Sequence, residues 1–335
     1  MVLWAMVSRW LLGRFTAVQS CFQIGTVMTL SIGILAAAPL APQPSLAAVP
    51  LALSVVGTFA SLFAASAFMR RWGRRKGLLV GVALAVVGVS TIGAALLTGN
   101  FALACAGFLV FGLHQSFMQF LRFMAMEAAG TEHSARALSW VLVGGIPAAI
   151  LGPLFGLMGR DLLGAPFAGS YLLLLGVLAV QAALILTLPD TRRADAVALE
   201  GARPWAKRLA DPSLWLAVTA SSFSFGLMVM LMSAAPVAMH EHGHPLTAST
   251  VAIQIHVLGM FVPSFFSGAL VKAWGPRRLI GVGLALFAAE TIVALSGTGL
   301  VPFFVALAVL GVAWNFLYVG GTALLVTRYR PAEKA

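Results

Sequence analysis

Two pairs of side chains in this sequence have the type and spacing to bind a soft metal ion: Met228 with Met232, and His256 with Met260. Residues four apart lie on one face of a helix, so each pair presents its donor atoms together. Thioether sulfur and imidazole nitrogen suit Cu(I), whereas Mg²⁺ and Ca²⁺ prefer oxygen ligands. Methionine also fills irregular gaps in apolar cores, and a histidine inside a membrane can bond to a neighbouring helix, so packing roles stay open.

The two helices expected to carry these pairs are apolar and long enough to cross a bilayer. Met228 lies eight residues before Pro236, and His256 lies nine residues after Thr247. At 1.5 Å per residue both side chains would lie about 12–14 Å below the outer ends of two antiparallel spans, close to the bilayer midplane. The sequence therefore predicts a ladder of four soft donors along a path through the membrane.

Three histidines alternate in the short segment between these two helices, at His240, His242 and His244. Alternating imidazoles can collect Cu²⁺ or Zn²⁺ and pass copper inward. An exposed polar turn would have the same composition. A metal-capture site at this outer loop is therefore one of two hypotheses for the segment.

The overall composition requires many such helices. Of the 335 residues 60% are hydrophobic and only 9% are charged, whereas a soluble domain has about 25% charged residues. A bilayer is crossed by about 20 apolar residues in a helix, and ten runs reach that length. Their approximate ranges are 15–38, 47–69, 77–98, 101–125, 136–159, 167–188, 213–236, 247–271, 278–297 and 301–326.

The net charge of +11 follows from how the basic residues are placed along these runs. In an alternating ten-span chain, every lysine and arginine except Arg160 falls on one side of the membrane. Basic loops mark the cytoplasmic side, so we expect both termini to be cytoplasmic. Nucleic-acid binding is not expected. The expected partners are membrane lipid and a small transported ion or molecule, with no stable protein partner.

The sequence lacks the residue patterns of an enzyme. The glycines from Gly81 to Gly88 have neither the spacing nor the flanking strand of a phosphate-binding loop. No Ser-His-Asp set or pair of carboxylates stands out, and Cys21 and Cys105 provide no disulfide framework. We therefore expect a protein that is not an enzyme and that requires no cofactor.

One long polar connection and an internal repeat divide the chain. The connection 189–212 separates six spans in 1–188 from four spans in 213–335. Two sequence patterns recur across this boundary, which implies two similar helical bundles with a substrate site between them. The recurring patterns are Trp72-Gly73 with Trp274-Gly275, each followed by basic residues, and Gly112–Phe117 with Gly311–Phe316.

These features resemble the major facilitator superfamily over essentially the whole chain. The segment after Trp72 resembles the family's loop between its second and third helices, although Arg70 stands where an acidic residue is usual. The pattern Ala148-x-x-x-Gly152-Pro153-x-x-Gly156 resembles a fifth-helix motif of antiporters in that family. The resemblance implies an all-α membrane protein of two bundles (6+4 helices) that works by alternating access and lacks the last two of the usual twelve helices. It also implies a cytoplasmic gating loop at Arg71, Gly73, Arg74 and Arg75.

The methionine and histidine pairs resemble those of the CcoA-type copper importers within this superfamily. That resemblance implies copper as the transported ion, for assembly of cbb3-type cytochrome oxidase in the bacterial inner membrane. The family's cavity is lined by its fourth and tenth helices, which implies a further set of cavity-lining candidates. This set is His114, Gln119, Asn315 and Tyr318.

Two alternatives to copper import stay open. The first is transport of an organic solute, such as riboflavin or another metabolite or drug, which the glycine-proline pattern at 152–153 and the aromatic tenth span favour. The second is a membrane protein that binds metal or assists assembly without transporting anything.

Overall fold

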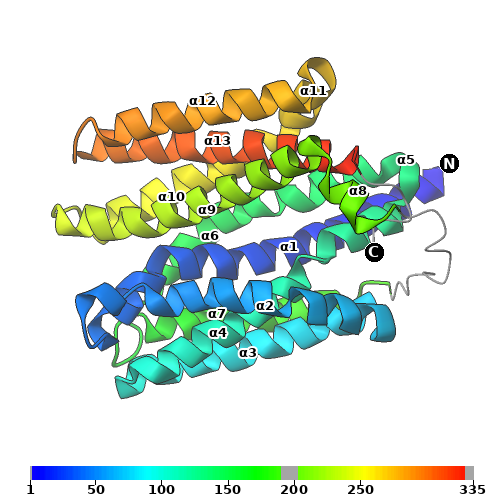
Figure 1. Ribbon diagram of the computed structural model, residues 1–335. Helices are drawn as coiled ribbons and strands as arrows, with labels where there is room; N and C mark the ends of the chain where they lie inside the picture. Colours follow the sequence, from blue (N-terminus) through cyan, green and yellow to red (C-terminus); the bar gives the residue numbers. More distant parts are fainter. Residues whose placement is uncertain (1, 190–202, 329–335) are drawn as a thin grey trace. The chain divides into compact units, whose positions relative to one another are not determined.

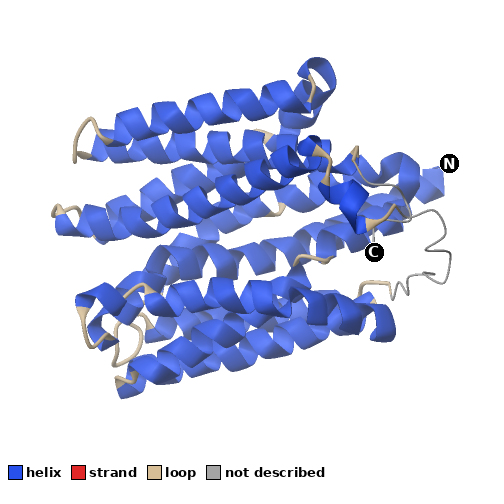
Figure 2. Ribbon diagram, in the orientation of Figure 1, coloured by secondary structure: helices blue, strands red, loops and turns tan. Residues whose placement is uncertain are grey.

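The computed structural model describes residues 2–189 and 203–328, and every regular element within these ranges is a helix, as the sequence predicts (Figure 2). The elements before the central connection are α1 (Val2–Ala37), η1 (Ala38–Leu40), η2 (Pro44–Leu46), α2 (Val49–Trp72), α3 (Arg74–Thr98), α4 (Phe101–Met118), α5 (Leu121–Val143), α6 (Gly145–Met158) and α7 (Ala168–Leu186). Those after it are α8 (Trp205–Leu209), α9 (Pro212–Glu241), α10 (Leu246–Phe261), α11 (Ser264–Trp274), α12 (Pro276–Ala294) and α13 (Leu300–Val326) (Figure 1).

The chain divides into two compact units. Unit 1 comprises Met1–Arg193 and Pro236–Gln254, and unit 2 comprises Ala194–Ala235 and Ile255–Ala335. The outer end of α9 and most of α10 therefore group with unit 1, in contrast to the simple boundary at 189–212 expected from sequence. The predicted bundle boundaries stay a prediction, and residues 190–202 of the connection lie outside the described ranges.

Most of the described helices are long and apolar enough to cross a membrane. Eight helical stretches qualify, two of which, Phe101–Ala129 and Trp140–Met158, run across the α4–α5 and α5–α6 boundaries. A ninth is obtained if α10 and α11 form one span bent by 40°. The one remaining predicted span, 278–297, corresponds to α12, whose 19 residues include the charged side chains Arg277, Arg278 and Glu290. The two arginines lie in its first turn, where long basic side chains can extend from a span end to the interface.

Besides the single-residue division at Gly144 between α5 and α6, within the span expected at 136–159, two of the predicted spans are interrupted in the structure. The span expected at 101–125 breaks between α4 and α5 at 119–120, and α5 continues as helix through the polar stretch expected to be a loop. The span expected at 247–271 breaks at 262–263. The second break has a physical cause, because Pro263 has no backbone N–H and interrupts the intrahelical hydrogen bonds.

The recurring Trp-Gly sequences mark equivalent turns in the two units. Gly73 joins α2 to α3 with φ 92° and ψ 154°, and Gly275 joins α11 to α12 with φ 79° and ψ 156°. This backbone conformation is open essentially only to glycine. The repeat therefore preserves a sharp turn between two helices, followed by basic residues.

The second repeat preserves a close crossing of two helices. In unit 1 a Cβ on Gly57 of α2 would lie 3.3 Å from the Cα of Gly112 in α4. In unit 2 a Cβ on Gly259 of α10 would lie 3.4 Å from the Cα of Gly311 in α13. Gly259 follows Gly57 by 202 residues and Gly311 follows Gly112 by 199. The two halves thus share one backbone contact that depends on small residues.

Candidate functional site

His256 lies on α10 in unit 2 and is fully buried. Its Nδ1 lies 3.0 Å from the carbonyl oxygen of Leu307 in α13. A carbonyl oxygen only accepts hydrogen bonds, so Nδ1 carries the proton and Nε2 presents a lone pair. Nε2 has no hydrogen-bond partner. A histidine whose protonated nitrogen is fixed by a carbonyl while the other nitrogen stays available has the arrangement of a metal ligand.

The three methionines predicted to act with His256 are buried in the same unit. Met228 is 3%, Met232 1% and Met260 6% exposed, whereas Met230 between the first two is 58% exposed. Met228 and Met232 therefore lie on an inward face of α9 and Met230 on an outward one. The described residues contain no group of three His, Cys, Asp or Glu placed to hold a metal ion, so thioethers would have to complete such a site.

The three histidines of the predicted capture site lie where α9 ends and the turn to α10 begins. His240 and His242 are exposed and His244 is half-buried. The Nδ1 of His242 lies 2.8 Å from the carbonyl oxygen of Ala238, one turn back along its own helix. A histidine side chain that ends a helix makes this contact whether or not it binds a metal. The capture site therefore stays a prediction.

Asn315 on α13 ties this helix to the α10–α11 junction. Its Nδ2 donates hydrogen bonds to the carbonyl oxygen of Met260 and to Oγ of Ser264, both at 2.7 Å. Its Oδ1 is buried and has no hydrogen-bond partner. The predicted cavity residue Asn315 is therefore held in one orientation and presents an unused acceptor.

An aromatic pair adjoins Asn315. The rings of Trp314 and Tyr318 stack at 4.8 Å between centroids with an interplanar angle of 9°, and Phe261 packs edge-on against Trp314. Trp314 is 6% exposed, and its indole Nε1 has no hydrogen-bond partner. The sequence analysis named Tyr318 and missed Trp314. The position of Trp314 in the second repeat, next to Asn315, was the available signal.

The predicted cavity residues of unit 1 lie in or just after α4. His114 is buried, its Nδ1 lies 3.0 Å from the carbonyl oxygen of Gly81, and its ring packs against Phe22 and Phe111. Gln119 is half-buried at the break after α4. The surroundings of His114 are those of a packed core residue that links two helices.

The predicted gating loop lies at the turn between α2 and α3. Arg71 is exposed, while Arg74 is only 9% exposed and pairs with Glu127 of α5 at 2.5 Å. Arg75 donates a hydrogen bond of 3.4 Å to the carbonyl oxygen of Leu188. The sequence analysis did not identify Glu127, which takes the role of an acidic partner for this loop from a distant position in the chain.

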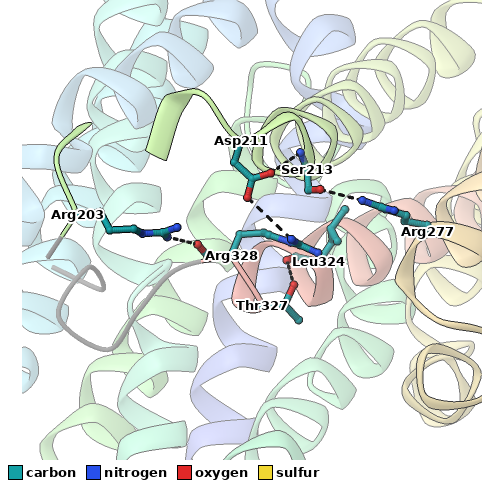
Figure 3. A network of polar contacts seen from close by, with 7 residues as sticks. All are labelled: Arg203, Asp211, Ser213, Arg277, Leu324, Thr327 and Arg328. Atoms are coloured by element: carbon teal, nitrogen blue, oxygen red, sulfur yellow. Dashed lines mark hydrogen bonds and ion pairs between the residues drawn. The ribbon is translucent and has the colours of Figure 1, made fainter. Parts of the chain in front are cut away.

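A second polar network ties the start of α9 to α12 and α13 within unit 2 (Figure 3). Asp211 accepts a hydrogen bond of 2.9 Å from the backbone N–H of Ser213 and lies 4.0 Å from the guanidinium of Arg328. Arg277 donates to Oγ of Ser213 at 2.9 Å, and Arg203 donates to the carbonyl oxygen of Arg328 at 2.6 Å. These contacts fix the segment that leads into α9.

Comparison with known proteins identifies the fold and the family. Among solved structures, the nucleoside transporter NupG matches with a TM-score of 0.65 at 14% identity, over 97% of this chain and 84% of NupG. The Escherichia coli fucose:proton symporter FucP matches with a TM-score of 0.57 at 15% identity, over 96% of this chain and 88% of FucP. At these identities the likeness shows the fold alone.

Sequence relatives extend this result. The riboflavin transporter RfnT of Brucella anthropi is 38% identical over 314 residues, which cover 92% of this chain and 78% of RfnT. An uncharacterized MFS-type transporter of Bacillus subtilis, YddS, is 28% identical over 324 residues, covering 91% and 74%. These relatives include a riboflavin transporter, whereas the sequence analysis favoured the copper-importer branch.

The family model of the Major Facilitator Superfamily matches residues 5–335. The spans of the structure, the repeat and the transporter relatives agree with that match and with a non-enzymatic role. The chain is a multi-pass membrane protein of the secondary-transporter type and belongs to the Major Facilitator Superfamily.

Proposed function

We propose that this protein transports riboflavin or a closely related organic solute. The observation that carries the proposal is the 38% identity to the riboflavin transporter RfnT, which extends over 92% of the chain. Identity of this extent covers most of the chain and therefore includes residues of both units. The order of the two leading hypotheses from sequence is therefore reversed.

We propose the bacterial inner membrane as its location, with cytoplasmic termini. In unit 1 the start of α1 and the basic α2–α3 turn lie at one end (Figure 1). Unit 2 has the same arrangement: one end of it holds α8, the basic α11–α12 turn and the end of α13 (Figure 1). Basic residues concentrate on the cytoplasmic side of membrane proteins, which supports this orientation. Arg330 and Lys334, which contribute to the same charge bias, lie outside the described residues.

Uptake of radiolabelled riboflavin tests the proposal directly. The protein would be produced in a bacterium that neither synthesises nor imports riboflavin, and growth on low riboflavin would be measured in parallel. We expect uptake and growth above the empty vector. Absence of both at verified membrane abundance, together with no riboflavin binding by the purified protein, would contradict the proposal.

Copper import is a second candidate, favoured by the available Nε2 of His256 and by three buried methionines in the same unit. Thioether and imidazole donors suit Cu(I) and release it more readily than thiolates. Radioactive copper uptake would be compared between the native chain and Met228→Leu, His256→Leu and Met230→Leu variants. Met230 is the matched control, because its side chain is 58% exposed. Copper import predicts that only the first two substitutions abolish uptake.

A further inference from the structure

The two units use the same helix crossing but differ in the polar residues placed on it. Ser54 and Ser116 of unit 1 correspond in the repeat to His256 and Asn315 of unit 2. The Ser54 hydroxyl donates to Leu51 O at 2.7 Å, and the Ser116 hydroxyl donates to Leu113 O at 2.8 Å. In unit 1 both hydroxyl groups therefore have partners, and Oγ of Ser116 also accepts a hydrogen bond of 2.9 Å from the Ser61 hydroxyl of α2.

In unit 2 the same positions carry longer side chains with unused polar atoms. The atoms are Nε2 of His256 and Oδ1 of Asn315, and the neighbouring Trp314 adds its indole N–H. All three residues are more than nine-tenths buried. An unpaired buried polar group costs free energy, and three of them on one helix pair indicate groups kept available for a ligand.

Trp314 and Asn315 are anchored to the same turn of α10. The Asn315 amide bonds to the carbonyl oxygen of Met260, and the Trp314 ring packs on Phe261. The indole donor and the amide acceptor therefore lie at one level of the α10–α13 pair. A carbonyl oxygen accepts but cannot donate, so the Asn315 NH₂ group must face Met260 and its Oδ1 must face away from that bond.

This arrangement combines one donor with one acceptor, and Tyr318 holds the ring that carries the donor. Trp314 and Tyr318 are stacked nearly parallel, at 9°. A ring edge in which a carbonyl adjoins an N–H complements an adjacent donor and acceptor, and the flavin ring carries such an edge in its pyrimidine portion.

We propose that Trp314, Asn315 and Tyr318 form a recognition element for the pyrimidine edge of a flavin-type ring. The indole N–H of Trp314 donates to a ring carbonyl, and Oδ1 of Asn315 accepts from the ring N–H. Tyr318 stacks on the Trp314 ring and holds the plane in which the indole N–H points. This inference rests on the proposed riboflavin transport and assigns its specificity to unit 2.

Equilibrium binding to the purified full-length protein tests the recognition element, with quenching of flavin fluorescence as the measured signal. Trp314→Phe keeps an aromatic ring but removes the N–H, so riboflavin affinity should fall about five- to ten-fold, the loss expected for one hydrogen bond. Trp274→Phe is the matched control, because Trp274 is exposed at the end of α11 in the same unit. The riboflavin affinity of this variant should equal that of the native protein.

A change in the ligand tests Asn315 without disturbing its bonds to Met260 and Ser264. Riboflavin methylated at the ring N–H cannot donate to Oδ1 and should bind the native protein at least about ten-fold more weakly than riboflavin. Equal affinity of both ligands, or native affinity in Trp314→Phe, would overturn the recognition element while riboflavin uptake stands. Absence of any riboflavin binding and uptake by the native chain would overturn the proposed function and this inference together.

Discussion

At the crossing of α10 and α13 a single added methyl group, in Gly311→Ala, is expected to destabilise the protein. In Gly311→Ala the new Cβ would lie 2.9 Å from the carbonyl carbon of Gly259 and from the amide nitrogen of Met260, and it would also collide with the carbonyl oxygen of His256. These neighbours are all backbone atoms, so no side-chain rotation can relieve the contact. The two helices must move apart.

The size of the effect follows from the distances. Carbon atoms pack comfortably at about 3.5 Å, so the helices must separate by at least about 0.5 Å. One turn away, the 2.7 Å bonds of Asn315 to Met260 and Ser264 would lengthen towards about 3.2 Å, the limit of a good hydrogen bond. Overpacking costs about 1–3 kcal/mol, and the loss of an interhelical bond costs about 0.6 kcal/mol on average, so with two such bonds we expect a loss of about 2–4 kcal/mol.

Thermal stability of the detergent-solubilised protein, followed by size-exclusion chromatography after heating, measures this loss. The melting temperature of Gly311→Ala should fall by about 5–10 °C. Gly281→Ala in α12 is the control, because nothing lies within 4 Å of its Cβ, and Gly112→Ala should reproduce the loss at the equivalent crossing of unit 1. A Gly311→Ala protein that melts with the Gly281→Ala control would refute the close crossing.

Three smaller perturbations test other contacts by the same melting assay. Asp211→Ala removes the side-chain cap of α9 and the 4.0 Å ion pair with Arg328, so the free energy of unfolding should fall by about 1–2 kcal/mol. Asp211→Asn keeps a capping oxygen and should keep most of the stability. Equal losses in the two variants would argue against capping. Glu127→Gln removes the carboxylate that pairs with buried Arg74 and should cost about 1–2 kcal/mol, part of which Arg74→Gln restores in the double variant. An unchanged melting temperature in Glu127→Gln would contradict that role. Gly99→Ala forces alanine to φ 67° at the end of α3, where its Cβ meets nothing, and should cost about 1 kcal/mol of conformational energy alone. A larger loss would indicate a packing contact at this turn.

The helical class and most of the spans follow from composition and hydrophobic run length. The interruptions do not, because a hydrophobic run of suitable length looks the same whether its helix is continuous or broken. Pro263 was a visible signal for the break before α11, since proline removes a backbone donor. The break at 119–120 has no such residue, and the structure gives no single-residue cause for it. The contact-based grouping of 236–254 with unit 1 depends on contacts distant in sequence, which no local pattern encodes.

Candidate site residues divide in a similar way. Helical spacing places Met228 and Met232 on one face, and their burial with Met230 exposed matches that geometry. The state of the His256 ring depends on Leu307, 51 residues away, and could not be read from spacing. Glu127 was missed for the same reason, because its partner Arg74 lies 53 residues earlier in the chain.

The internal repeat is the observation that links fold to function most directly. It holds the backbone of the two crossings constant, with Gly112 and Gly311 each admitting a neighbouring helix at near-contact distance. Because the backbone of the two crossings is alike, a difference in residue type at an equivalent position indicates a difference in the role of that side chain. The hydroxyl groups of Ser54 and Ser116 have partners on their own helices, and that of Ser116 also on α2, whereas His256 and Asn315 keep one polar atom each without a partner at the same two positions. Such atoms are costly in a membrane, where no bulk water compensates them. Their presence at these two positions in only one of the two repeats, with the unpaired indole N–H of Trp314 on the same helix as Asn315, is explained if solute recognition rests mainly on α10 and α13.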